Sequence, residues 1–118
     1  MNSLLFRTTA VFGFLAVALG AFGAHALKGT LAANDTTEVW KTAVLYQFVH
    51  VIALLVLATG PTTSRAVAIF FVAGIVIFSG SLYLLALTNI KWLGAITPLG
   101  GLCFLAGWIC LVFWPPVR

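Results

Sequence analysis

The sequence predicts an all-α integral membrane protein: one domain, residues 1–118, built as an up-down-up-down four-helix bundle. Only 7% of the residues are charged, against about 25% in a soluble domain. These few charges leave four uncharged runs of about 20 to 26 residues, long enough for helices that cross a bilayer. The runs lack the polar–apolar alternation of transmembrane β-strands. The expected spans are residues 4–27, 36–58, 65–87 and 92–113.

The first span carries small residues on one face. Ala16, Gly20 and Ala24 recur every four positions, a spacing that lets another helix approach closely in lipid. We expect Lys28 to lie near the negative end of the helix dipole and Gly29 to act as the C-cap. The string Ala-His-Ala at 24–26 imitates a signal-peptide cleavage site, but the apolar run before it is longer than usual. We therefore expect a retained span.

Start and stop residues delimit the next two spans. A short polar link at 31–34 precedes residues 35–38, Asp-Thr-Thr-Glu, which resemble a capping box at the start of the second span. Gly60-Pro61 ends that span, because proline cannot continue a helix. Residues 62–64 offer N-caps for the third span, which ends at Thr88-Asn89.

A proline lies near the start of the fourth span. Pro98, followed by two glycines, predicts a kink there because it removes a backbone donor and clashes with the preceding turn. Trp114 and two prolines end the span. Alternating crossings place Trp40 and Trp92 at the opposite interface from Trp114, as in the aromatic belts of membrane proteins.

Composition and spacing exclude several classes of function. The basic residues stand singly at span boundaries, which argues against nucleic-acid binding. No span contains Asp or Glu, so the proton-coupled exchange of a small multidrug antiporter is disfavoured. The sequence holds no Ser-His-acid arrangement, phosphate-binding loop or metal-ligand spacing. We therefore expect no catalytic residues, no metal and no cofactor.

One polar stripe crosses the second span. Tyr46, Gln47 and His50 share a helix side, and His50 lies near the middle of the bilayer. Three readings stay open for His50: hydrogen bonding that fixes helix register, proton or ligand handling, and metal or haem ligation. In the first reading, His50 and Gln47 hydrogen-bond the third span, where Ser79, Ser81 and Tyr83 offer partners. The candidate polar cluster comprises His50, Tyr46, Gln47, Ser79, Ser81 and Tyr83. His25, near the end of the first span, is expected to be a capping or interface histidine.

Four strings resemble the YgdD-like family, small bacterial inner-membrane proteins that form a domain family of unknown function with a small eukaryotic transmembrane relative. They are residues 20–27, the set Trp40, Ala43, Tyr46, Gln47 and His50, residues 78–83, and residues 97–101 with Trp108. The resemblance spans nearly the whole chain. It implies a four-span fold and an inner-membrane location but no activity. It also marks His25 and Pro98 as candidate interface or cap positions, beside the polar cluster.

The function we expect is that of a non-enzymatic interaction or accessory protein. One alternative is a small transporter or channel in which His50 changes protonation. A second is a lipid- or quinone-binding protein. The expected partners are membrane lipids and a second copy of the chain, which would pack on the glycine-rich face of the first span.

Overall fold

The computed structural model describes residues 3–60 and 65–116. Within these ranges four helical segments are long and apolar enough to cross a membrane, so the predicted fold class is confirmed. The third segment contains a π-helical turn, and the fourth begins with a 3₁₀ turn. The elements are α1 (Ser3–Ala24), α2 (Lys28–Asn34), α3 (Thr37–Thr59), α4 (Arg65–Gly74), η1 (Ile75–Ser79), α5 (Gly80–Thr88), η2 (Lys91–Ala95) and α6 (Thr97–Phe113).

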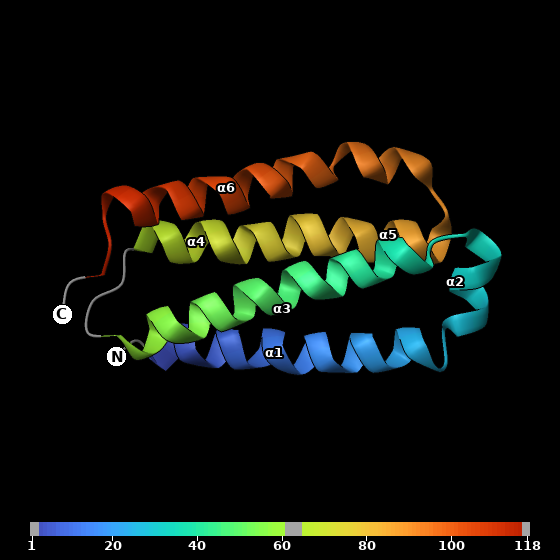
Figure 1. The fold of residues 1–118 in the computed structure, drawn as a ribbon, viewed down its shortest axis with the longest axis horizontal. Coiled ribbons are helices and arrows are strands. Elements are labelled where there is room, and N and C mark those ends of the chain that lie inside the picture. Colours follow the sequence, from blue (N-terminus) through green and yellow to red (C-terminus); the bar gives the residue numbers. More distant parts are fainter. Residues whose placement is uncertain (1–2, 61–64, 117–118) are drawn as a thin grey trace.

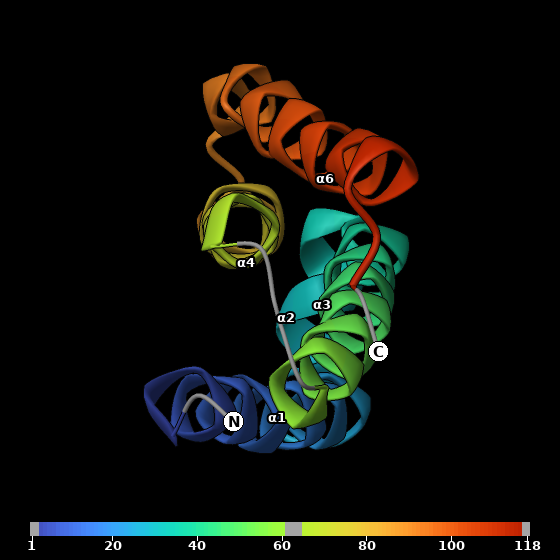
Figure 2. The same ribbon diagram turned by 90° about the vertical axis from the view of Figure 1, so that its left-hand side faces the viewer.

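The helices stack in the order α1, α3, α4–α5 and α6, with α1 and α6 outermost (Figures 1 and 2). The molecule measures 49 × 26 × 17 Å. The short helix α2 lies at the end where α3 begins and α5 finishes, opposite the start of α1 and the end of α6 (Figure 1). Residues 61–64, expected to end the second span and cap the third, lie outside the described residues.

The first link is a helix, not the polar link expected at residues 31–34. α1 ends at Ala24 instead of Leu27, and Gly29 lies inside α2 rather than acting as a C-cap. The reason is Leu31, which is only 1% exposed and packs in a core cluster with Trp40 and Ala86. Burying this leucine holds a helical turn at the end of the bundle.

The predicted capping box at 35–38 does not form. The Thr36 hydroxyl donates instead to the Ala86 carbonyl at 2.8 Å, and the Asn34 amide donates to the same carbonyl at 3.0 Å. The last carbonyls of a helix have no partner within the helix, so these side chains from α2 and the α2–α3 link serve the end of α5. Asn89 ends α5 in the left-handed conformation, at φ 57°, as its position after Thr88 suggested.

The break near Pro98 lies before α6 rather than within it. The chain passes from the 3₁₀ turn η2 through Ile96 into α6, and Pro98 occupies the first turn of that helix. A proline there removes no intrahelical hydrogen bond, because the first amides of a helix have no carbonyl partner.

The backbone of α6 approaches the third span closely at the π-helical turn. A Cβ added to Gly100 would lie 2.3 Å from the backbone nitrogen of Phe78. Two further glycines receive aromatic rings, with Phe104 over Gly74 and Phe71 over Gly107. Because these three glycines have no side chains, the two helices can approach each other closely.

The glycine-rich face of α1 is covered by α3 of the same chain. Val51, Val44 and Trp40 pack over Gly13, Gly20 and Gly23, respectively. A homo-oligomer stays a prediction, but α3 already contacts these three glycines, whereas Ala24 of the same face is exposed. Trp40 is also only 3% exposed, so it is a packing residue and not part of an aromatic belt, whereas Trp92 and Trp114 are exposed.

Candidate functional site

The interior polar side chains form separate groups rather than one cluster. Gln47 pairs with Tyr83, and His50 pairs with Trp108. Ser81 pairs with Thr97, while Ser79 binds a backbone carbonyl. The six predicted residues therefore divide among different helix contacts, and two of their side-chain partners, Trp108 and Thr97, lie on α6.

Gln47 joins three helices. Its side-chain nitrogen donates to the Phe12 carbonyl of α1 at 2.8 Å, and its side-chain oxygen accepts from the Tyr83 hydroxyl of α5 at 2.6 Å. The Trp40 ring packs against the Tyr83 ring, with centroids 4.8 Å apart. In hydrocarbon an amide must find such partners within the protein, so Gln47 fixes the register of α3 against both neighbours.

His50 uses both ring nitrogens within the protein. The Trp108 indole donates to its Nε2 at 3.0 Å, and its Nδ1 lies 2.7 Å from the Tyr46 carbonyl. An indole N–H can only donate, so Nε2 is the acceptor and Nδ1 carries the proton that it donates to Tyr46. The hydrogen bonds thus select the neutral Nδ1–H tautomer of His50, and both ring nitrogens have partners within the protein.

Aromatic rings enclose the His50 imidazole. Phe104 stacks on it with centroids 3.6 Å apart and an interplanar angle of 12°, and Phe71 meets it edge-on at 5.2 Å. His50 itself is 4% exposed, while Trp108 and Tyr46 are 41% and 42% exposed. The imidazole is therefore a buried bridge between α3 and α6, with Trp108 and Tyr46 on its outer side.

The predicted hydrogen bond of His50 to Ser79, Ser81 or Tyr83 is wrong, because the imidazole bonds to other residues. Its side-chain partner is Trp108, a residue that the sequence marks only through the family resemblance. One signal could have identified it: an indole N–H within an apolar span needs an acceptor, and His50 is at a comparable depth. Tyr46 contributes its backbone carbonyl, and its ring packs on Phe78 at 4.7 Å.

The two serines fasten the third span on both sides. The Ser79 hydroxyl donates to the Ala43 carbonyl of α3 at 2.8 Å. Ser81 shares a hydrogen bond of 2.6 Å with the hydroxyl of Thr97 in α6. Both are contacts between neighbouring helices, the usual role of small hydroxyl side chains in membrane proteins.

His25 lies apart from these groups. It is exposed in the turn between α1 and α2, where its carbonyl accepts from the Lys28 amide at 3.3 Å. Its place at the end of the bundle suits an interface histidine, which stays a prediction together with the roles of the other candidate residues.

Replacing Gln47 with leucine should lower the free energy of unfolding by about 1–2 kcal/mol, since two interhelical hydrogen bonds disappear and the Tyr83 hydroxyl loses its acceptor. Tyr83→Phe removes only one of these bonds and should cost about half as much. Thermal unfolding in detergent micelles measures both changes. Equal stability of Gln47→Leu and the wild type would show that these bonds do not hold α3 in register.

Comparison with known proteins identifies the family of this chain. A family model described as "Protein of unknown function (DUF423)" matches residues 19–101. This range includes Gln47, His50 and Ser81 but not Phe12 and Trp108, the partners of the first two. The chain belongs to the DUF423 family. Its resemblance to the YgdD-like proteins is thereby confirmed.

Close relatives of this DUF423 protein are named as membrane proteins. It is 46% identical to the UPF0382 membrane protein YwdK of Bacillus subtilis, over 87% of this chain and 88% of the relative. It is 47% identical to the UPF0382 membrane protein SAB0533 of Staphylococcus aureus, over 87% of each. The UPF0382 inner membrane protein YgdD of Escherichia coli is 41% identical, over 87% of this chain and 82% of that protein. No solved structure matches the chain.

These names and the four spans agree on location. The chain is a small multi-pass protein of the bacterial inner membrane, and its family has no assigned function. None of the three relatives is named for an enzyme activity.

Proposed function

We propose that this protein is a non-enzymatic accessory or interaction protein of the inner membrane, in which the interior polar groups hold the helices together. The observation that supports this is the pairing of those groups. Among the described residues, every buried side-chain nitrogen and oxygen has a hydrogen-bond partner. A catalytic or transport site would be expected to keep polar atoms available for its substrate.

The pairing of His50 supports this function over proton transport. A proton relay needs a histidine that can accept a proton on one side and release it on the other. Nε2 of His50 already accepts the Trp108 N–H, so protonating it would set two N–H groups against each other. Phe104 and Phe71 surround the ring with apolar surface.

Proton flux into proteoliposomes tests the proposal against its strongest alternative. Vesicles that contain the wild type and enclose a pH-sensitive dye should respond to an imposed pH difference like empty vesicles do. His50→Ala should behave in the same way. A flux carried by the wild type and lost in His50→Ala would establish the transporter or channel instead.

The lipid- or quinone-binding alternative has a separate test. Protein extracted in mild detergent should show no absorption beyond that of its aromatic residues. A quinone spectrum that persists through purification, and disappears in Trp108→Ala, would replace the accessory function with a cofactor-binding one.

A further inference from the structure

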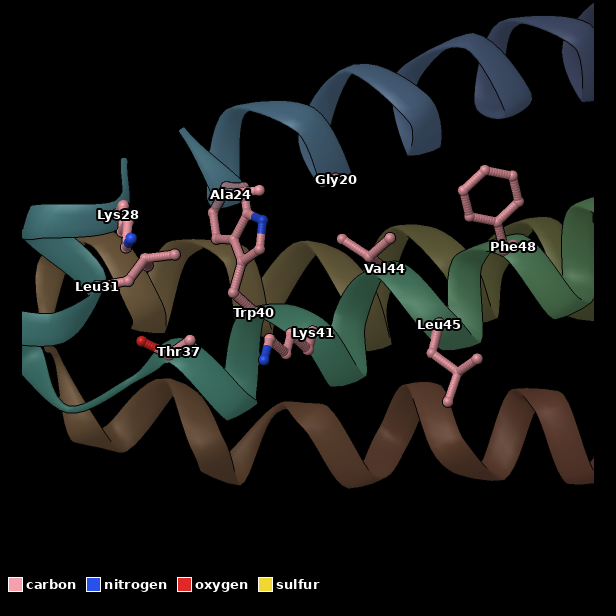
Figure 3. Close-up of a pocket in the computed structure, with 11 residues that line it drawn as sticks. Gly20, Ala24, Lys28, Leu31, Thr37, Trp40, Lys41, Val44, Leu45 and Phe48 are labelled. Carbon is pink, nitrogen blue, oxygen red and sulfur yellow. The ribbon is translucent and has the colours of Figure 1, made fainter. Parts of the chain in front are cut away.

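A groove of about 660 Å³ lies between α1 and α3 at the α2 end of the bundle. Figure 3 shows Gly20 and Ala24 on α1, with Val44 and Phe48 of α3 pointing toward that helix. Leu45 of α3 also lines the groove. The small residues of α1 leave this space open, and exposed Leu45 and Ala24 place it at the lipid-facing surface. Its volume lies within the range of about 300–1,000 Å³ that small-molecule pockets occupy.

The groove is cationic at one end and apolar along the rest. Lys28 at the start of α2 and Lys41 in α3 both line the end next to Trp40 (Figure 3). Phe48 lies seven residues beyond Lys41 on α3, about 10 Å deeper at 1.5 Å per residue. The polarity therefore changes along the groove in the same direction as it does from the surface to the centre of a bilayer.

The acidic residues of the chain lie outside the lining of this end of the groove. The lining contains two lysines and neither of the acidic residues of the chain, Asp35 and Glu38. Glu38 lies 3.5 Å from Lys41, but both side chains are largely exposed, and exposed ion pairs of this kind are weak. The first turn of α3 adds the positive end of a helix dipole, with Thr37 in the lining.

We propose that this groove binds one anionic phospholipid, with its phosphate between Lys28 and Lys41 and one acyl chain along Gly20, Val44 and Phe48. Hydrocarbon must fill the apolar part in any membrane, because an empty groove would lose dispersion contacts. The two lysines select among lipids, since basic side chains at the membrane surface attract anionic headgroups. This site is independent of the proposed accessory function.

Native mass spectrometry tests the charge selection. Wild-type protein in mild detergent, mixed with equal amounts of phosphatidylglycerol and phosphatidylcholine of the same acyl chains, should retain one phosphatidylglycerol in about tenfold excess over phosphatidylcholine. The double variant Lys28→Gln/Lys41→Gln should lose this preference. Lys91→Gln is the matched control and should keep the preference, because Lys91 is an exposed lysine of η2 that does not line the groove.

A second pair of variants tests the apolar part. Ala24→Phe places a ring in the groove and should abolish retention of either lipid. Ala21→Phe, also at an exposed position of α1 but outside the lining, should not. Helical circular dichroism of all variants confirms that they are folded.

Three results would overturn the proposal. They are equal retention of the two lipids by the wild type, an unchanged preference in Lys28→Gln/Lys41→Gln, and a protein dimer that is lost in Ala24→Phe. The last would mean that a second copy of the chain occupies the groove.

Discussion

Gly100→Ala is expected to destabilise the protein by about 2–3 kcal/mol, at the upper end of the roughly 1–3 kcal/mol that an extra methylene costs in a closely packed interior. The new Cβ would lie 2.3 Å from the nitrogen and 2.7 Å from the Cα of Phe78. These are backbone atoms of the π-helical turn η1, so no side-chain rotation can relieve the clash. α6 would have to move away from the third span and loosen the Ser81–Thr97 hydrogen bond.

The adjacent glycine is a matched control. A Cβ added to Gly101 would have its nearest contact at 3.9 Å, with a side-chain carbon of Phe78. Gly101→Ala should therefore unfold at or slightly above the wild-type temperature, because alanine favours a helix over glycine. Thermal unfolding in detergent micelles compares the two variants. Similar melting temperatures for Gly100→Ala and Gly101→Ala would refute the close approach of α6 and η1.

His50→Ala is expected to lower the free energy of unfolding by about 3 kcal/mol, as when other large buried side chains are truncated to alanine. The variant loses the stacking of Phe104 on the imidazole at 3.6 Å. It also deprives the Trp108 N–H of its acceptor, and an unpaired N–H in an apolar environment adds to the cost. The contact between α3 and α6 should weaken most.

Trp108→Phe distinguishes the contribution of the Trp108–His50 hydrogen bond from that of the Phe104–His50 stacking. It keeps an aromatic ring on α6 but cannot donate to His50, so it should cost about 1 kcal/mol. In the double variant His50→Ala/Trp108→Phe the two losses of unfolding free energy should not add, because each single variant removes the same hydrogen bond. SDS-induced unfolding of the wild type, the two single variants and the double variant measures this coupling. Additive losses would mean that the His50–Trp108 hydrogen bond contributes nothing to stability.

The candidate site was only partly predictable, for a physical reason that Gln47 and His50 illustrate. A polar side chain in an apolar span must point into the bundle, so the helical spacing of Gln47 and His50 predicts that both are buried. The partner of each depends on which neighbouring helix faces it. Tyr83 was foreseen as a partner of Gln47, but His50 turns to Trp108, 58 residues further along the chain.

The α2 segment shows the same division. Its residues look polar in the sequence because Lys28, Asn34 and Asp35 frame it, and this favoured a simple link. The side chain that decides its structure is Leu31, which becomes buried only because Trp40 and Ala86 come together there. Likewise, Thr36 has the sequence context of a helix cap, but its hydroxyl donates to the Ala86 carbonyl. That carbonyl lies in the last turn of α5 and has no partner within its own helix.

Charge spacing alone established the membrane location, the helical class and the number of spans, since the bilayer requires each apolar segment to satisfy its backbone hydrogen bonds internally. That requirement is local and can be read from 20 consecutive residues. Only the tertiary structure decided which polar groups pair, that α3 covers the glycine face of α1, and where the lipid-facing groove opens. Those features depend on contacts between distant residues, where van der Waals fit and hydrogen bonding select one arrangement among several that the same apolar helices could adopt.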